Sequence, residues 1–125
     1  MIWALIQVGL GGAIGSMLRL LAGLGAVRLF GQGFPMGIIS VNVVGSLIMG
    51  SVVVFLEQRG QMHLSPLLMT GLLGGFTTFS AFSLEAFALF ERGSPVQAGF
   101  YVLSSVGLSI GALVIGVVAA RAVLA

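Results

Sequence analysis

The chain has 125 residues, of which 58% are hydrophobic and only 6% are charged. A soluble domain carries about a quarter of its residues charged, so this composition excludes a soluble domain and indicates a membrane protein. The net charge of +2 arises from five arginines and three glutamates, too few for the basic surface that nucleic-acid binding requires. Since the chain contains no cysteine, disulfides, thiolate nucleophiles and cysteine-based metal sites are excluded as well.

Four apolar segments follow one another, and each reaches the length of about 20 residues that spans a bilayer. The stretch from Gly31 to Pro35 supplies turn chemistry, and Pro35, Pro66 and Pro95 each stand where a helix would begin. No feature of a cleavable signal peptide is apparent, so we expect the first segment to remain as a membrane helix. The pattern predicts an all-α membrane protein with a single transmembrane domain over residues 1–125 and helices over about residues 2–30, 36–56, 66–90 and 95–124.

The third segment contains an interruption. Gly74, Gly75, Thr77 and Thr78 are all poor helix formers and fall within five residues. In hydrocarbon an unwound backbone is tolerated only where it is buried in protein or lines a polar cavity, and broken transporter helices direct carbonyl groups toward ions in this way. We therefore predict that the third helix is broken mid-membrane. The alternative is an unbroken helix with a packing face of glycine and threonine.

Small residues recur at four-residue spacing within each segment, which lets helix backbones approach closely in lipid. The pairs are Gly11/Gly15, Ser46/Gly50, Gly71/Gly75 and Gly107/Gly111. We interpret them chiefly as packing faces. Because four short helices form a bundle too thin to enclose a pore alone, we expect a homo-oligomer.

The arginines near the ends of the spans are divided evenly between the two sides of the membrane. With four spans, Arg59 and Arg121 share one side, whereas Arg28 and Arg92 share the other. Because the arginines are balanced, the positive-inside rule predicts no preferred orientation of the chain in the membrane. The balance favours insertion in both orientations and an antiparallel, dual-topology homodimer. The alternative is that a further cue, such as a glutamate or the N-terminal amine, fixes one orientation.

Arg19, Asn42 and Glu85 are three of the polar side chains inside the predicted spans, where such groups are costly and face protein or water. Arg19 either attracts anions into a wet vestibule, snorkels, or pairs with Glu85 or with helix-end carbonyls. Asn42 either makes an interhelical hydrogen bond with no transport role or lines an ion path. Glu85 lies roughly 10 Å along its helix from the polar end at Arg92, and suits a vestibule, a proton relay or an ion pair.

Two aromatic rings share a helix face just beyond the predicted break. Phe79 and Phe82 are three residues apart, and the same face extends to Ser80 and Ser83. Phenylalanine on a membrane helix usually packs against neighbours or lipid. The edge of an aromatic ring, however, is the positive part of its quadrupole, so rings held edge-on can line the path of a small anion.

A stripe of hydroxyl groups is predicted on the fourth segment, where Tyr101, Ser105 and Ser109 repeat at four-residue steps. These groups can donate to an anion, or simply to a neighbouring carbonyl. No enzymatic motif stands beside them. His63 is single and lies in a loop, no carboxylate pair has catalytic spacing, and no phosphate-binding loop is present.

Together these residues resemble the Fluc (CrcB) family of fluoride channels. The resemblance depends on Gly12-x-x-Gly15-x-x-x-Arg19, on Val41-Asn42-x-x-Gly45, and on the specific run from Gly74 to Ser83. It implies an antiparallel homodimer with two fluoride pores. It also implies a structural Na⁺ at the dimer interface, held by backbone carbonyls of Gly74 and Thr77 from both copies.

The resemblance further implies a role for each polar or aromatic residue described above. Arg19 would lie in the aqueous vestibule, and the pore would be lined by Asn42, Phe79, Phe82, Ser80, Ser83, Tyr101, Ser105 and Glu85. Two positions depart from the family pattern, because Ala81 and Ile38 stand where threonine is common. Fluoride would then depend more on Ser80, on Ser83 and on the fourth segment, or move more slowly.

The expected function is that of a fluoride-selective channel, not an enzyme, which exports fluoride passively and so lowers its cytoplasmic concentration. Its partners would be fluoride, membrane lipid and a second copy of the chain, in the cell membrane (the inner membrane of a Gram-negative cell). One alternative is a small dual-topology proton-coupled multidrug exporter. Such exporters need a titratable carboxylate near the midplane, commonly in the first span, where this chain has Arg19 and no acid. Another alternative is a structural membrane protein.

Overall fold

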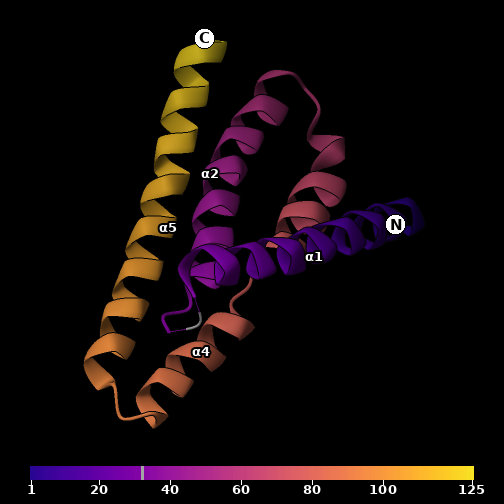
Figure 1. The fold of residues 1–125 in the computed structure, drawn as a ribbon. Coiled ribbons are helices and arrows are strands. Elements are labelled where there is room, and N and C mark those ends of the chain that lie inside the picture. The colour runs from indigo at the N-terminus through magenta and orange to yellow at the C-terminus, as the bar shows by residue number, and fades with distance from the viewer. Residues whose placement is uncertain (32) are drawn as a thin grey trace.

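Four helical segments, each long and apolar enough to cross a membrane, make up the computed structural model, which describes residues 1–31 and 33–125 (Figure 1). The first two are α1 (Ile2–Phe30) and α2 (Met36–Gln58). The fourth is α5 (Pro95–Leu124). The prediction of an all-helical chain with four spans is confirmed over the described residues. Gln32, within the predicted turn between the first two helices, lies outside them.

The third segment is interrupted, as predicted. It comprises a short 3₁₀ turn, η1 (Met62–Leu64), then the π-helix η2 (Pro66–Leu73) and the short α3 (Gly74–Phe76), and it resumes as α4 (Ser80–Glu91). Between α3 and α4 the backbone of Thr77 is extended, with φ −87° and ψ 162°. Figure 1 shows this gap as a thin connection leading into α4. The alternative of an unbroken helix is therefore wrong.

Tight turns that contain a glycine follow α2 and α4. Gly60 and Gly93 have φ values of 64° and 80°, in the left-handed region that favours glycine. In the second turn the N–H groups of Gly93 and Ser94 bond back to the carbonyls of Phe90 and Leu89, both at 3.1 Å. Such bonds satisfy carbonyls that the helix end leaves without partners. The turn also brings α5 back alongside α4.

Close helix contacts hold α2 against α5. A Cβ atom at Gly50 would overlap the carbonyl oxygen of Leu113, and one at Gly116 would overlap that of Leu47. The two helices consequently pack backbone to backbone, side by side in Figure 1. By contrast, a Cβ at Gly107 or Gly111 would meet no atom within 4 Å, so this predicted pair makes no packing face with the described part of the chain.

Glycines also hold α1 against the first half of the third segment. A Cβ at Gly11 would overlap the carbonyl of Leu67, and one at Gly15 would overlap that of Leu72. From the other side, a Cβ at Gly75 would lie 2.7 Å from the carbonyl oxygen of a glycine in α1. The predicted small-residue pairs of these two segments therefore pack on each other and place the break beside α1.

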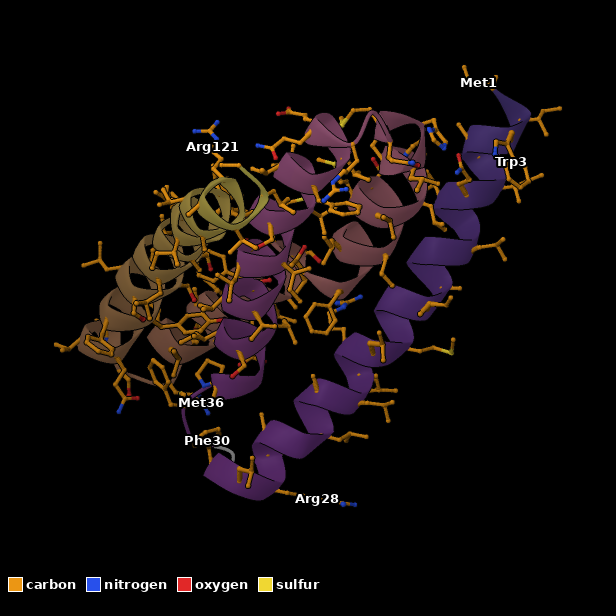
Figure 2. The ribbon with its side chains drawn as sticks, turned by 90° about the horizontal axis from the view of Figure 1, so that it is seen from above. Met1, Trp3, Arg28, Phe30, Met36 and Arg121 are labelled. Atoms are coloured by element: carbon orange, nitrogen blue, oxygen red, sulfur yellow. The ribbon has the colours of Figure 1, made fainter. Side chains whose placement is uncertain are left out.

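The two ends of α1 reach well past this contact. Viewed from above, Met1 and Trp3 mark one end of the helix, and the side chain of Arg28 points away from the other helices at the opposite end (Figure 2). Much of the apolar surface of α1 is exposed, including Leu20 at 65% and Leu29 at 80%. Such continuous apolar exposure suits contact with lipid.

Candidate functional site

Asn42 anchors the interruption of the third segment to α2. Its Nδ2 donates to the carbonyl oxygen of Thr78 at 2.9 Å, and its Oδ1 accepts from the N–H of Thr78 at 2.8 Å. One side-chain amide thus satisfies both backbone groups of one residue, as a neighbouring strand would. Asn42 therefore makes a hydrogen bond between segments, from α2 to the non-helical residue Thr78, and its place on an ion path stays a prediction.

Gly45, one turn further along α2, makes room for this arrangement. A Cβ atom there would overlap Cγ2 of Thr77 and would approach Cδ2 of Phe76 to 3.3 Å. Thr77 cannot turn aside freely, because its Oγ1 donates to the carbonyl of Leu73 at 2.9 Å. The absence of a side chain at Gly45 therefore lets the break lie directly on α2.

Two more side chains satisfy backbone groups around the break. From α1, Nε of Arg19 donates to the carbonyl of Gly75 at 3.1 Å, which confirms pairing with helix-end carbonyls among the interpretations of this residue. Oγ1 of Thr78 accepts from the N–H of Ala81 at 3.1 Å. This second bond caps the first turn of α4, where a helix otherwise leaves N–H groups without partners.

The carbonyls of Gly74 and Thr77 are left without such partners. In a regular helix they would accept from the N–H groups of Thr78 and Ala81, which here donate to side-chain oxygens. Over the described ranges, 1–31 and 33–125, neither carbonyl accepts another hydrogen bond. The two backbone oxygens assigned to a cation by resemblance are therefore free to coordinate one.

A cavity of about 460 Å³ lies between α2, the break and α5. Its lining combines polar groups with aromatic rings, among them Asn42, Thr77, Thr78, Phe79, Phe82, Ser105 and Ser109. The structure thus brings together, around one cavity, residues from three segments that the sequence singled out separately. We call this space the pore cavity.

Three hydroxyl groups on α5 are buried and make no close hydrogen bond among the described residues, although those of Tyr101 and Ser105 lie near each other. They are the Tyr101 hydroxyl, Ser105 Oγ and Ser109 Oγ, which form the predicted stripe on α5. Ser105 and Ser109 line the pore cavity, whereas Tyr101 does not. A buried polar group without a partner costs about 1–3 kcal/mol. Native proteins rarely retain such groups in a row unless a ligand or water satisfies them.

The aromatic rings form a connected cluster, of which Phe79 and Phe82 line the pore cavity. Phe82 is 7% exposed, and its ring centroid lies 5.4 Å from that of Phe79 and 5.3 Å from that of Tyr101. Phe34 meets Tyr101 edge-on at 5.6 Å; sequence reasoning missed this contact, although the aromatic residue directly before Pro35 was a possible signal. Phe79, in contrast, is 76% exposed.

The remaining serines predicted for the pore lie on the α4 side of the break. Ser80 Oγ is 3.4 Å from the hydroxyl of Thr78. Ser83 Oγ donates to the carbonyl of Phe79 at 2.9 Å and is exposed in the single chain. Neither serine lies among the lining residues of the pore cavity.

A second cavity, of about 360 Å³, lies on the other side of the break, between α1, α2 and α4. Arg19 and Glu85 both line it, and they form no ion pair in the part of the chain that is described. Ile38 and Ala81 line it as well, so both departures from the family pattern fall in this cavity, and Thr78 borders both cavities. We call it the vestibule cavity.

Comparison with known proteins places this arrangement in a family. A family model described as "CrcB-like protein, Camphor Resistance (CrcB)" matches residues 6–117. The chain is 55% identical over 125 residues to the "Fluoride-specific ion channel FluC" of Ruegeria sp. (strain TM1040), covering 99% of both chains. It is 57% identical over 122 residues to the protein of the same name from Roseobacter denitrificans, covering 96% of this chain and 97% of that one. The chain therefore belongs to the CrcB family.

Proposed function

We propose that this protein is a fluoride-selective channel in the cell membrane, which lets fluoride leave the cell passively. Its relatives from Ruegeria and Roseobacter are named fluoride-specific ion channels, and the match extends over nearly the whole of each chain. The observation that carries the proposal is the row of buried hydroxyls on α5 that make no close hydrogen bond among the described residues. A row of unsatisfied donors suits a series of weak sites for a small anion.

Neutral groups would replace the water around fluoride in the pore cavity. Ser105 and Ser109 offer O–H donors, and the second N–H of the Asn42 amide remains beside them. The edges of Phe79 and Phe82 add positive partial charge without a full charge. Conduction requires sites strong enough to admit an ion and weak enough to release it, a balance that neutral donors favour over a lysine.

The vestibule cavity would collect fluoride before it enters the pore. Among the described residues only Nε of Arg19 makes a hydrogen bond, to the break, so within that part of the chain the other guanidinium N–H groups are available to attract an anion into the cavity. The negative charge of Glu85, which lines the same cavity, would weaken this attraction. Ile38 and Ala81 make its wall less polar than two threonines would.

The functional unit would be an antiparallel homodimer. Phe79 is 76% exposed in the single chain although it borders the pore cavity. Along α5, Gly107 and Gly111 leave a face with open space, where a second helix can approach closely. A second copy packed on these surfaces would complete the wall of the pore.

The same dimer would hold Na⁺ between its two copies. The free carbonyls of Gly74 and Thr77 are neutral oxygen ligands, which suit a hard cation. Each copy offers this pair, so a cation between the copies would be shared by carbonyls of both. The resident ion would therefore be structural, while fluoride is the transported substrate.

An efflux assay tests the proposal. Liposomes containing the purified protein should release fluoride to a fluoride electrode and should retain chloride; chloride flux of equal size would overturn the selectivity. Phe82→Ile should lower fluoride flux by at least about tenfold while the protein remains dimeric, because it removes a ring edge and keeps an apolar side chain. Uptake of a cationic dye driven by a pH gradient would instead support the exporter.

A further inference from the structure

Over the described residues, the backbone carbonyls around the break differ in whether they have hydrogen-bond partners. Gly74 and Thr77 are free, whereas the carbonyl of Gly75 accepts from Arg19 and that of Thr78 accepts from Asn42. This difference does not come from helix geometry alone, because an interrupted helix simply leaves its last carbonyls without partners, as at Phe76 among the described residues. Three side chains from different parts of the sequence produce it.

We propose that Asn42 and Thr78 are positioning residues for the cation site, which keep the carbonyls of Gly74 and Thr77 open by binding the N–H groups that would otherwise close them. This inference rests on the sodium site of the proposed function. Asn42 accepts the hydrogen bond from the Thr78 N–H, which in a regular helix would go to the Gly74 carbonyl. The Thr78 hydroxyl likewise accepts from the Ala81 N–H, which would otherwise bond to the Thr77 carbonyl. Both side chains would act through the backbone and would not themselves bind the cation.

The hydrogen-bond geometry holds the N–H groups of Thr78 and Ala81 on their side-chain acceptors. Asn42 holds Thr78 by two bonds, of 2.9 and 2.8 Å, so the Thr78 peptide cannot rotate back toward Gly74 without losing both. The Thr78 hydroxyl accepts at 3.1 Å from an N–H three residues further along, as in a helix N-cap. One residue therefore receives the restraint from α2 and transmits it to the start of α4.

The remaining surroundings favour a monovalent ion. Within the described ranges, no group of three or more His, Cys, Asp or Glu residues is placed to hold a metal. Divalent ions such as Ca²⁺ usually take carboxylate ligands as well as carbonyls. Arg19, bonded to the carbonyl next to Gly74, adds positive charge that further disfavours a doubly charged ion.

The test measures Na⁺ binding through stability. Thermal unfolding of the purified dimer in detergent is followed as NaCl replaces N-methyl-D-glucamine chloride at constant ionic strength, because a ligand that binds only the folded state raises its stability. Asn42→Ala and Thr78→Val should each raise the half-maximal Na⁺ concentration by at least about tenfold, since each returns an N–H to a cation ligand.

Matched variants separate this role from general packing. Thr78→Ser keeps the hydroxyl acceptor that Thr78→Val removes, and should respond to Na⁺ as the wild type does. Ser46→Ala changes the same cavity wall as Asn42→Ala, but Ser46 makes no bond to the break among the described residues. It should also leave the Na⁺ response unchanged.

The outcomes distinguish this inference from the proposed function. If the wild type responds to Na⁺ and both Asn42→Ala and Thr78→Val respond equally, the positioning role is refuted and the sodium site stands. If the wild type shows no response, the sodium site fails and the positioning role fails with it, whereas fluoride efflux is judged separately.

If the variants do not fold, carbonyl ¹³C NMR of the wild type tests which carbonyls around the break respond to Na⁺. The signals of Gly74 and Thr77 should shift on addition of Na⁺. Those of Gly75 and Thr78, whose oxygens already accept hydrogen bonds, should shift far less. Equal shifts at all four positions would refute the proposal that only the carbonyls without hydrogen bonds bind Na⁺.

Discussion

Gly45→Ala should detach the break from α2 by adding a single methyl group. The new Cβ would overlap Cγ2 of Thr77, whose rotation is opposed by its hydrogen bond to Leu73. Overpacking of this kind costs about 1–3 kcal/mol. If the break moves away instead, the two bonds between Asn42 and Thr78 weaken, at about 1 kcal/mol for each bond lost. Either response lowers stability by about 1–3 kcal/mol.

A second substitution makes this reasoning testable. Thr77→Ser removes Cγ2 and retains the hydroxyl that bonds to Leu73, so the double variant Gly45→Ala/Thr77→Ser should recover most of the loss. The expected coupling between the two sites is about 1–3 kcal/mol, measured by reversible unfolding of the reconstituted protein and by fluoride efflux. Gly9→Ala, where a Cβ meets no atom within 4 Å, is the control. A neutral Gly45→Ala, or a double variant no better than Gly45→Ala alone, would refute the proposed clash.

Three further predictions concern the cavities and the orientation of the chain. Ser105→Ala removes a buried hydroxyl that makes no close hydrogen bond among the described residues, so thermal stability should rise by up to about 1 kcal/mol while fluoride efflux falls; a loss of both would mean that the hydroxyl is structural. Ala81→Thr adds a hydroxyl to the vestibule cavity and should raise efflux at low fluoride concentration, and an unchanged rate would show that this wall does not limit entry. Gln61→Cys introduces a single cysteine into the loop after α2, and an impermeant maleimide should label about half of the molecules from each side of the membrane. Labelling from one side only would rule out dual insertion.

The position of the break could be predicted because its cause is local. Glycine and β-branched residues disfavour a helix wherever they occur, and the interruption between Phe76 and Ser80 follows from that preference. The π-helix before it could not be predicted. Its backbone lies against the glycine face of α1, and packing of that kind depends on contacts between segments that are distant in the sequence.

The choice among equally spaced glycines also required the structure. Gly107 and Gly111 satisfy the small-residue pattern, but α2 contacts Gly116 instead. Spacing identifies a possible face, whereas the partner helix determines which face is packed. The partner of Asn42 could not be predicted either, because an amide can bond to many groups. In the structure its donor and acceptor are both satisfied by one residue 36 positions away.

The full engagement of Thr78 has a consequence for control of the channel. Its N–H, carbonyl and hydroxyl all have partners, and the lining of the pore cavity contains no charged side chain. Membrane voltage acts on charges, by about 2.3 kcal/mol per elementary charge for each 100 mV. With a neutral, firmly held wall there is little for voltage to displace, so we expect the passage to stay open at rest. A cell would then adjust its fluoride tolerance through how much of this protein it makes.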